Sequence, residues 1–315
     1  MSGLTDAPVV AEVVRSGVVE SVHRGALLAL AADGSVAYAI GDAWTPLFPR
    51  SANKPLQAVA MLRHGLSLDG ELLALAAASH SGERFHVDGA RQILADAGLD
   101  ASFLQCPPAL PMDPTANRDA GGAASRLAMN CSGKHAAMLA TCVANDWPTD
   151  TYLDLEHPLQ VAILRTVEEV ASEHVAAFGV DGCGAPVLAL SLRGLARAFR
   201  SLALAASGSP EGRVASAFRT HPAWTSGSVR EEHLLMRAVP GLVNKAGAEG
   251  VDALALPDGR TVTLKIIDGN QRARVPVALA ALQRLGVETP PLHDVSPSPI
   301  LGGERAVGEI RAVGI

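Results

Sequence analysis

A serine followed three residues later by a lysine occurs in Arg50-Ser-Ala-Asn-Lys-Pro55. Proline is tolerated in the first turn of a helix, so the motif predicts a helix near Pro55, with Ser51 at its start and Lys54 about one turn on. A serine hydroxyl becomes a nucleophile when a base takes its proton, and a desolvated neutral lysine is such a base. The same string also fits a helix-capping serine followed by a solvated lysine.

Lysine is rare in this chain. Of 26 basic residues, 22 are arginines and only four are lysines, at positions 54, 134, 245 and 265. Arginine stays charged at any working pH, whereas a buried lysine can lose its proton and act as a base. The lysines are therefore candidates for chemistry, although Lys265, which lies between Leu264 and Ile266 and can pair with Asp268, fits a structural role better.

Two further strings place polar side chains beside predicted helices. Ser79-His-Ser-Gly-Glu83 follows a very apolar helix and fits either a site wall or an ordinary C-terminal turn. Asn130-Cys-Ser-Gly-Lys-His135 gathers a thiol, a hydroxyl, an amine and an imidazole where a small-residue loop opens a helix. Free N–H groups at such a start can bind an anion or an oxyanion, although a buried cysteine with capping Ser132 fits as well. The loop lacks the upstream glycine of a Walker motif.

A fourth string, Asp181-Gly-Cys-Gly-Ala-Pro186, predicts a tight turn that leads into a helix from Pro186. Its Cys183 and Cys131 could share a metal ion, but two cysteines 52 residues apart carry no spacing signal. On general grounds His135 or Asp181 would be an ordinary third zinc ligand, and Lys134 an unusual one.

A fifth string surrounds Lys245, in the Gly/Ala-rich segment 243–250, which we predict to be a loop. Few side chains compete for space there, so the lysine can approach another backbone closely.

Strands at both ends of the chain and helices in the middle must position these strings. This order predicts an α+β fold with one mainly antiparallel sheet packed against helices, as a single domain over 1–315 or two subdomains with the site between them. Segment 106–117 contains four prolines and is predicted to be a long loop. The predicted strands are 9–14, 18–22, 26–30, 36–40, 251–256, 261–267 and 306–313. The predicted helices are 55–64, 70–78, 87–97, 134–144, 158–173, 186–205, 211–219, 231–239 and 270–285.

Composition argues against several classes of protein. The formal net charge is −6 and only 11 residues are aromatic, so neither a basic face nor stacking aromatics favour a nucleic-acid partner. The most apolar long stretch, 186–206, is interrupted by three arginines at helical spacing, which argues against a membrane span. The first six residues lack a secretion signal, and the four cysteines show no disulfide framework, so we expect a cytoplasmic protein.

Taken together and in this order, the five strings resemble the thermolabile, rhizobial-type L-asparaginase family. The Cys-Ser-Gly-Lys-His element is the most diagnostic, and the resemblance runs from 17–26 to 268–270. It implies a fold similar to serine β-lactamases and penicillin-binding proteins, a homodimer, and L-asparagine as a small-molecule substrate. Neither nucleic acid nor membrane is implied as a partner.

The resemblance also implies roles at the matching positions. Ser51 and Lys54 would be the nucleophile and its base, and Ser79 and Lys245 a second Ser-Lys tandem for proton transfer and substrate placement. The family's zinc ligands match Cys131, Lys134 and Cys183, with a water completing the shell. The residues expected to contact the substrate are Arg50, His80, Glu83, Ser132, His135 and Asp181.

Three functions remain open at this point. The first is an amidohydrolase in which Ser51, activated by Lys54, attacks the side-chain carboxamide of L-asparagine. The second is a β-lactamase-like or peptidase-like Ser-Lys hydrolase, and the third is a non-catalytic, metal-stabilised protein that binds an amino acid. Asparagine and glutamine both remain candidate substrates, because one methylene in a pocket is worth only about 1–3 kcal/mol of discrimination.

Overall fold

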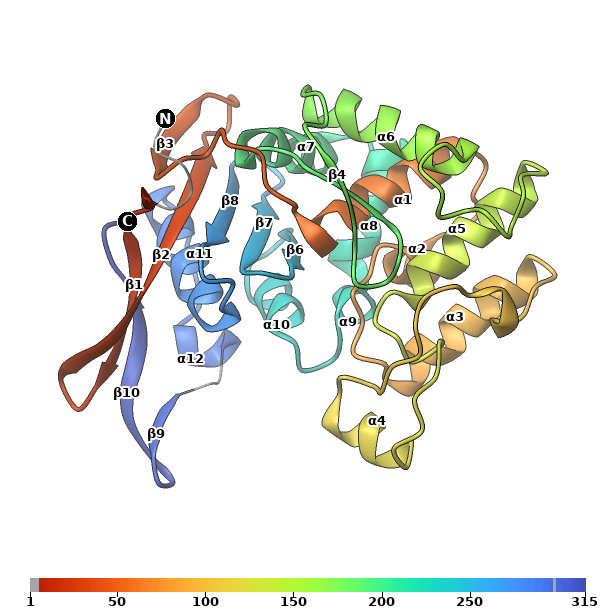
Figure 1. Ribbon diagram of the computed structural model, residues 1–315. Coiled ribbons are helices and arrows are strands. Elements are labelled where there is room, and N and C mark those ends of the chain that lie inside the picture. Colours follow the sequence, from red (N-terminus) through yellow and green to blue (C-terminus); the bar gives the residue numbers. More distant parts are fainter. Residues whose placement is uncertain (1–5, 297–298) are drawn as a thin grey trace. The chain divides into compact units, whose positions relative to one another are not determined.

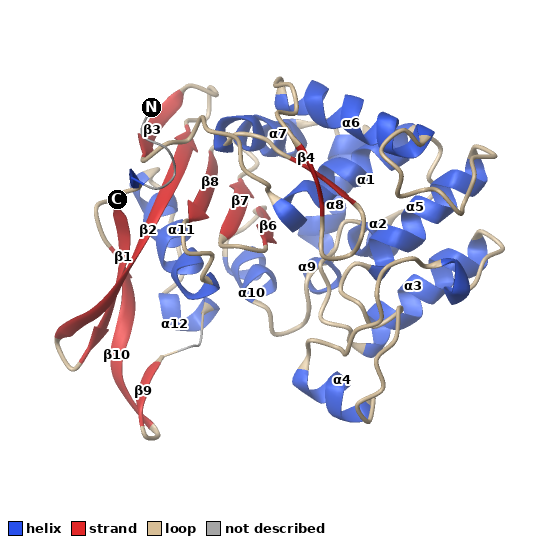
Figure 2. Cartoon of the chain, in the orientation of Figure 1, coloured by secondary structure: helices blue, strands red, loops and turns tan. Residues whose placement is uncertain are grey.

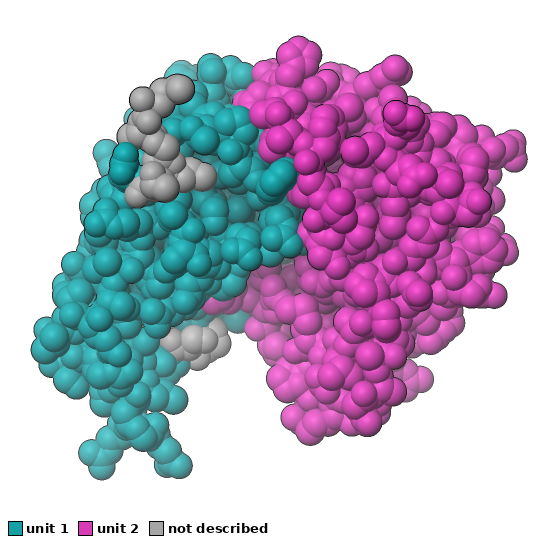
Figure 3. Space-filling view, in the orientation of Figure 1, with its two compact units in different colours: residues 1–52, 190–204, 234–315 teal, residues 53–189, 205–233 magenta. Residues whose placement is uncertain are grey.

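The computed structural model describes residues 6–296 and 299–315. The chain divides into two compact units, coloured separately in Figure 3. Unit 1 comprises residues 1–52, 190–204 and 234–315, and unit 2 comprises 53–189 and 205–233. The first five residues, part of the segment read for a secretion signal, lie outside the described residues. Within the described ranges, none of the helices has the length and apolar content needed to cross a lipid bilayer.

Unit 1 is built on an antiparallel sheet (Figures 1 and 2). The strand order is β6-β7-β8-β2-β1-β10-β9, with β3 paired to β2. Every residue of β6 and β7 is buried, so this end of the sheet is covered on both faces. Helices α7 (Leu192–Leu204) and α11 (Arg274–Arg284) pack on β7 and β8. The strands are β1 Val9–Arg15, β2 Val18–Leu30, β3 Val36–Ile40, β6 Val243–Gly247, β7 Val251–Ala255, β8 Thr261–Ile266, β9 Ile300–Gly302 and β10 Arg305–Ala312.

Unit 2 is mainly helical and also contains the short hairpin β4–β5 (Figure 2). Helix α1 packs against α5, α6 and α8, while α2 packs against α5 and α8. The start of α5 lies directly on the end of α2, because a Cβ at Gly133 would come 2.5 Å from the Leu75 side chain. The helices are α1 Lys54–Arg63, α2 Gly70–Ala76, α3 Arg84–Asp96, α4 Pro114–Asp119, α5 Ser132–Ala144, α6 Pro158–Ala171, α8 Pro210–Thr220 and α9 Pro222–Thr225. Helix α10 (Glu231–Ala238) runs across the boundary, and α12 (Leu292–Val295) belongs to unit 1.

The antiparallel sheet and its packed helices confirm the α+β prediction. The strands predicted at 18–22 and 26–30 are one continuous strand, β2. Asn270 accepts a hydrogen bond from the Arg272 amide at 3.1 Å and so begins a 3₁₀ turn that leads into α11, close to the predicted start.

Two helix and loop predictions were wrong in unit 2. Residues 186–188 form β5, which pairs with β4 (Phe178–Val180), and the helix predicted from Pro186 begins only at Leu192. Glycines at 182 and 184 allow the chain to turn back as a hairpin, and Pro186 stands at the first position of a strand, where its missing N–H is tolerated. The predicted loop over 106–117 contains the start of α4, because Asp113 caps it by accepting from the Ala116 amide at 2.8 Å.

The loop predicted around Lys245 is instead the buried strand β6. Small residues allow close packing there, and pairing with β7 along its whole length satisfies the backbone groups of this strand that face β7. Pairing in this hairpin thus overrides the local Gly/Ala composition.

Candidate active site

Ser51 lies in a short 3₁₀ helix, Arg50–Asn53, that continues directly into α1. Pro55 is in the first turn of α1, as the Ser-x-x-Lys string predicts. Arg50 has φ = +54°, a left-handed backbone conformation that residues with side chains rarely adopt. The chain therefore turns sharply just before the serine, and such strained positions cluster at functional sites.

The strand that carries Lys245 packs against the segment that leads to Ser51. A Cβ at Gly247 would lie 2.2 Å from the carbonyl oxygen of Pro49, so only glycine allows this approach. Lys245 is 1% exposed, and its Nζ donates to the carbonyl oxygen of Ala246 at 3.0 Å. Unit 1 thus brings the Ser51 segment and the Lys245 strand together.

Lys54 is withdrawn from water within unit 2. The residue is 2% exposed, and its Nζ donates to the carbonyl oxygen of Ala78 at 2.6 Å and to Cys131 Sγ at 3.1 Å. Because Ala78 directly precedes Ser79, these bonds place the Lys54 amine at the start of the Ser79 loop and beside the first thiol of the Cys-Ser-Gly-Lys-His string.

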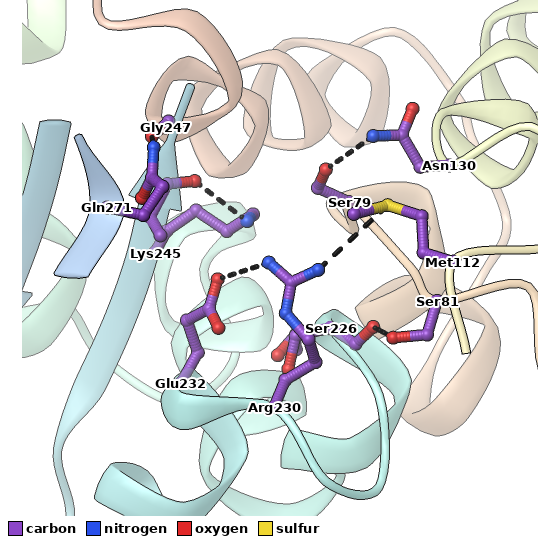
Figure 4. Close-up of polar contacts among 12 residues, drawn as sticks. Ser79, Ser81, Met112, Asn130, Ser226, Arg230, Glu232, Lys245, Gly247 and Gln271 are labelled. Carbon is purple, nitrogen blue, oxygen red and sulfur yellow. Dashed lines mark hydrogen bonds and ion pairs between the residues drawn. The ribbon is translucent and has the colours of Figure 1, made fainter. Parts of the chain in front are cut away.

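The Ser79 loop is locked to the loop that begins α5. Asn130 Nδ2 donates to Ser79 Oγ at 3.2 Å (Figure 4), and the His80 amide donates to the Asn130 carbonyl at 2.9 Å. His80 Nδ1 accepts from the Gly82 amide at 3.1 Å, so its Nε2 carries the ring hydrogen and donates to Ser132 Oγ at 2.9 Å. Burial holds the pKa of His80 well below its usual value. The predicted contacts His80 and Ser132 therefore bind each other.

Glu83 holds a loop of its own unit. Its Oε1 accepts from the Ser228 amide at 2.8 Å, and its Oε2 accepts from Ser228 Oγ at 2.7 Å. Both carboxylate oxygens are thus used in fixing the segment before α10.

Cys131, Lys134 and Cys183 form a buried cluster, with Cys183 supplied by the β4–β5 turn. The two thiols hydrogen-bond to each other, and Lys134 Nζ donates to Cys183 Sγ at 3.2 Å. The bond from Cys131, together with the Lys134 charge, lowers the pKa of Cys183 far below that of a free thiol, while the pKa of Cys131 is raised. Burial acts to lower the pKa of Lys134, but the negative charges of the thiols outweigh it and raise that pKa. The cluster therefore favours a buried thiolate–ammonium pair.

Asp181 belongs to the same β4–β5 turn as Cys183. Its Oδ1 accepts from the Gly182 amide at 2.8 Å, and its charge contributes to the raised pKa of Lys134.

His135 lies beside this cluster and is oriented by a residue that the sequence did not reveal. Tyr152, which is fully buried, places its hydroxyl 2.7 Å from His135 Nδ1, and the Gln105 amide donates to the same hydroxyl at 3.1 Å. The single hydroxyl hydrogen thus goes to Nδ1, and Nε2 carries the ring hydrogen. Among the described residues Nε2 has no hydrogen-bond partner, while the ring interacts with Cys183. Burial lowers the pKa of His135 to about 4.

The missed Tyr152 did leave one signal, since it is one of only two tyrosines in the chain.

No group of three or more His, Cys, Asp or Glu side chains in the described part of the chain is arranged to hold a metal ion. Lysine is not among those four residue types, so this finding does not concern the mixed set of Cys131, Lys134 and Cys183. Two adjoining thiols that can ionise are the chemistry zinc prefers, and the unpartnered N–H of His135 suits a thiolate beside it. The donor set therefore fits the expected ion.

The fold and site define an α+β protein with buried lysine and cysteine side chains beside serines at turns and helix starts. The sequence profile of the L-asparaginase II family matches residues 11–312. The chain therefore belongs to this family, which confirms the resemblance and supports a hydrolase function.

Solved structures share a more distant likeness. A β-lactamase from Mycobacterium bovis is 13% identical with a TM-score of 0.49, covering 83% of this chain and 94% of that one. EstCE1, a hydrolase with promiscuous acyltransferase activity, is 14% identical with a TM-score of 0.43, covering 83% and 93%. Simvastatin synthase from Aspergillus terreus is 12% identical with a TM-score of 0.39, covering 83% and 88%. No curated protein matches the chain.

Proposed function

We propose that this chain hydrolyses L-asparagine to L-aspartate and ammonia, with Ser51 as nucleophile and Lys54 as its base. The observation that carries this proposal is the position of Lys54, three residues after Ser51 at a helix start and 2% exposed. A general base must be held near the proton that it takes, and exclusion of water strengthens every polar interaction at the reacting atoms. A lysine in bulk water would have argued against the proposal.

The proposed reaction has two halves. Ser51 Oγ attacks the carboxamide carbon while the neutral Lys54 amine takes its proton, and Lys54 then passes that proton to the amide nitrogen as the C–N bond breaks and ammonia leaves. Water attacks the resulting ester, Lys54 takes the water's proton and returns it to Ser51 Oγ, and L-aspartate is released. Backbone N–H groups, including that of Ser51, are the proposed donors to the oxyanion.

Ser79 and Lys245 are proposed to assist proton transfer and substrate placement. The bond from Asn130 supports this role for Ser79, because it orients the hydroxyl. For the substrate ammonium we propose Asp181, since the carboxylate of Glu83 already holds Ser228.

We propose a zinc ion bound by Cys131, Lys134 and Cys183. When bound, the ion supplies a Lewis-acidic centre that fixes these side chains and orients a polar group of the substrate. His135 supports the arrangement, because its Nε2–H is available to Cys183 and its ring is fixed by Tyr152.

The decisive experiment is an ammonia-release assay on L-asparagine and L-glutamine, run with and without a chelator. Ser51→Ala should lower the rate at least about 1,000-fold, as removal of a serine nucleophile does elsewhere. Lys54→Arg should be nearly as damaging, because a guanidinium does not give up its proton. Ser216→Ala, on an exposed helix face, and Lys265→Arg are matched controls that should remain active. A fully active Ser51→Ala protein would refute the mechanism.

A further inference from the structure

The segment that leads into α10 is tied to the Ser79 loop by backbone and side-chain hydrogen bonds. The Ser79 amide donates to the Thr225 carbonyl at 3.1 Å, and Ser81 Oγ donates to the Ser226 carbonyl at 2.9 Å (Figure 4). Both partners belong to unit 2, so this attachment is internal to one compact unit. The backbone of residues 225–226 is therefore fixed to the Ser79 loop.

Two further features make this attachment rigid. Glu83 grips Ser228 through both its amide and its hydroxyl. Gly227 has φ = +154°, and a Cβ there would come 2.2 Å from Ser81 Oγ, so only glycine allows the backbone to pass this close to Ser81. Arg230 lies two residues after Ser228, and its side chain therefore extends from a rigid backbone segment.

The guanidinium of Arg230 has one strong and one weak partner. Its Nη2 forms an ion pair with the buried carboxylate of Glu232 at 3.3 Å, whereas its Nη1 lies 3.9 Å from Met112 Sδ, a poor acceptor. The side chain is 30% exposed, and Figure 4 shows the guanidinium between Glu232 and Met112. Met112 is itself anchored beside this loop, because the next residue, Asp113, donates its amide to the Ser81 carbonyl at 2.8 Å.

We propose that Arg230 binds the α-carboxylate of the substrate and so restricts the enzyme to amides of free amino acids. This inference rests on the proposed function and deepens it by naming the substrate class. A guanidinium matches a carboxylate with two parallel hydrogen bonds, which a thioether cannot offer. The substrate carboxylate takes the place of Met112 Sδ at Nη1, while the ion pair between Nη2 and Glu232 continues to orient the guanidinium.

The first test compares Arg230→Met and Arg230→Lys with Arg84→Met, whose parent side chain is 95% exposed in the same unit. Loss of charge-assisted hydrogen bonds to the carboxylate should raise the KM for L-asparagine roughly 10- to 100-fold, with kcat changed less than about threefold. Arg230→Lys should lie between Arg230→Met and wild type, and Arg84→Met should match wild type. An unchanged KM in Arg230→Met would overturn the inference.

The second test removes the carboxylate from the substrate instead of the arginine from the protein. The asparagine analogue whose α-carboxylate is replaced by a carboxamide should react equally poorly with wild type and Arg230→Met. If Arg230 merely supported the loop, both substrates would lose the same factor in Arg230→Met, and the inference would fail.

Binding measurements separate this inference from the proposed function. Calorimetry of L-asparagine with the Ser51→Ala protein, with and without Arg230→Lys, needs no turnover. Weaker binding in the double variant, together with a wild type that releases no ammonia, would keep the arginine's role and refute the asparaginase activity. Equal binding in both proteins would refute the arginine's role whatever the wild type does.

Discussion

Each unit of the molecule buries an ion pair, and the two pairs differ in whether their charges can disappear. In unit 1, Arg274 Nη1 donates to Asp252 Oδ2 at 2.5 Å, with the two side chains 2% and 0% exposed. In unit 2, Lys134 Nζ donates to Cys183 Sγ at 3.2 Å in an equally buried setting. A guanidinium stays charged in a protein, whereas an amine and a thiol can neutralise each other by passing one proton.

The surroundings of the two pairs match this difference. Asp252 also accepts from Asn244 Nδ2 at 2.6 Å, and Arg274 Nε donates to Gln271 Oε1 at 3.1 Å, so the charges in the sheet sit in a polar network. The Lys134–Cys183 pair has ionisable neighbours, because Cys131 lies beside it and accepts a hydrogen bond from Lys54. Fixed charges hold the sheet together, and movable protons are concentrated where we propose the chemistry.

Asp252→Asn breaks the fixed pair and should have the largest effect on stability. It leaves Arg274 buried without a counter-charge, and removal of one partner of a buried ion pair costs about 3–5 kcal/mol. Urea unfolding at neutral pH measures this loss. Adding Arg274→Met should recover part of it, and a loss below about 1 kcal/mol in the single variant would show that the Arg274 charge does not depend on Asp252 for its compensation.

Acid should weaken unit 2 through its buried histidines. Burial lowers the pKa of His86 to about 4 from the ordinary 6.5, so the folded protein binds this proton less readily than the unfolded chain. The neutral His86 costs the fold nothing above pH 6.5. As the pH falls towards 4, the unfolded chain binds the proton first, and the free energy of unfolding falls by about 2 kcal/mol at pH 5 and about 3 kcal/mol in full. Urea unfolding of wild type and His86→Gln between pH 7 and 5 measures it. The variant should lose less stability over that range, and identical slopes would contradict the assignment; His174→Gln, on a fully exposed side chain, serves as the control.

Lys134→Met in chelated protein should cost only about 1 kcal/mol. The thiol of Cys183 can take a proton once its ammonium partner is gone, so no uncompensated charge stays buried, and the methionine fills the space. The same variant should lose zinc, measured as bound metal after dialysis against a zinc buffer. A loss of stability as large as that of Asp252→Asn would mean that Cys183 keeps its negative charge without Lys134, so that this pair, too, has charges that cannot neutralise.

The sequence predicted which lysines stand apart better than it predicted the backbone that carries them. Three of the four lysines stood in strings rich in reactive side chains, and the structure buries these three. Their scarcity and their local neighbours were enough to single them out, whereas their proposed roles in the reaction stay predictions. Strand β6 was missed because its Gly/Ala-rich composition is typical of a loop, although its pairing partner β7 follows it directly in the chain. The helix predicted at Pro186 was wrong because the preceding glycine-containing turn lets the chain fold back as the β4–β5 hairpin. Tyr152 contacts His135 across 17 residues of sequence, which no local pattern encodes.

Lys265 is the one lysine outside the reactive strings, and its replacement should change stability and activity least. Its Nζ donates only to backbone carbonyl oxygens, those of Glu249 and Ile266, and Asp268 pairs with His23 at 2.7 Å instead. Burial lowers the pKa of Lys265, so its charge adds little to the fold. Lys265→Met should therefore change the free energy of unfolding by about 0.5 kcal/mol or less and leave ammonia release at the wild-type rate. Urea unfolding and the assay check both, and a marked loss of activity would mean that the rarity of lysine, rather than its company of thiols and hydroxyls, marks the functional positions.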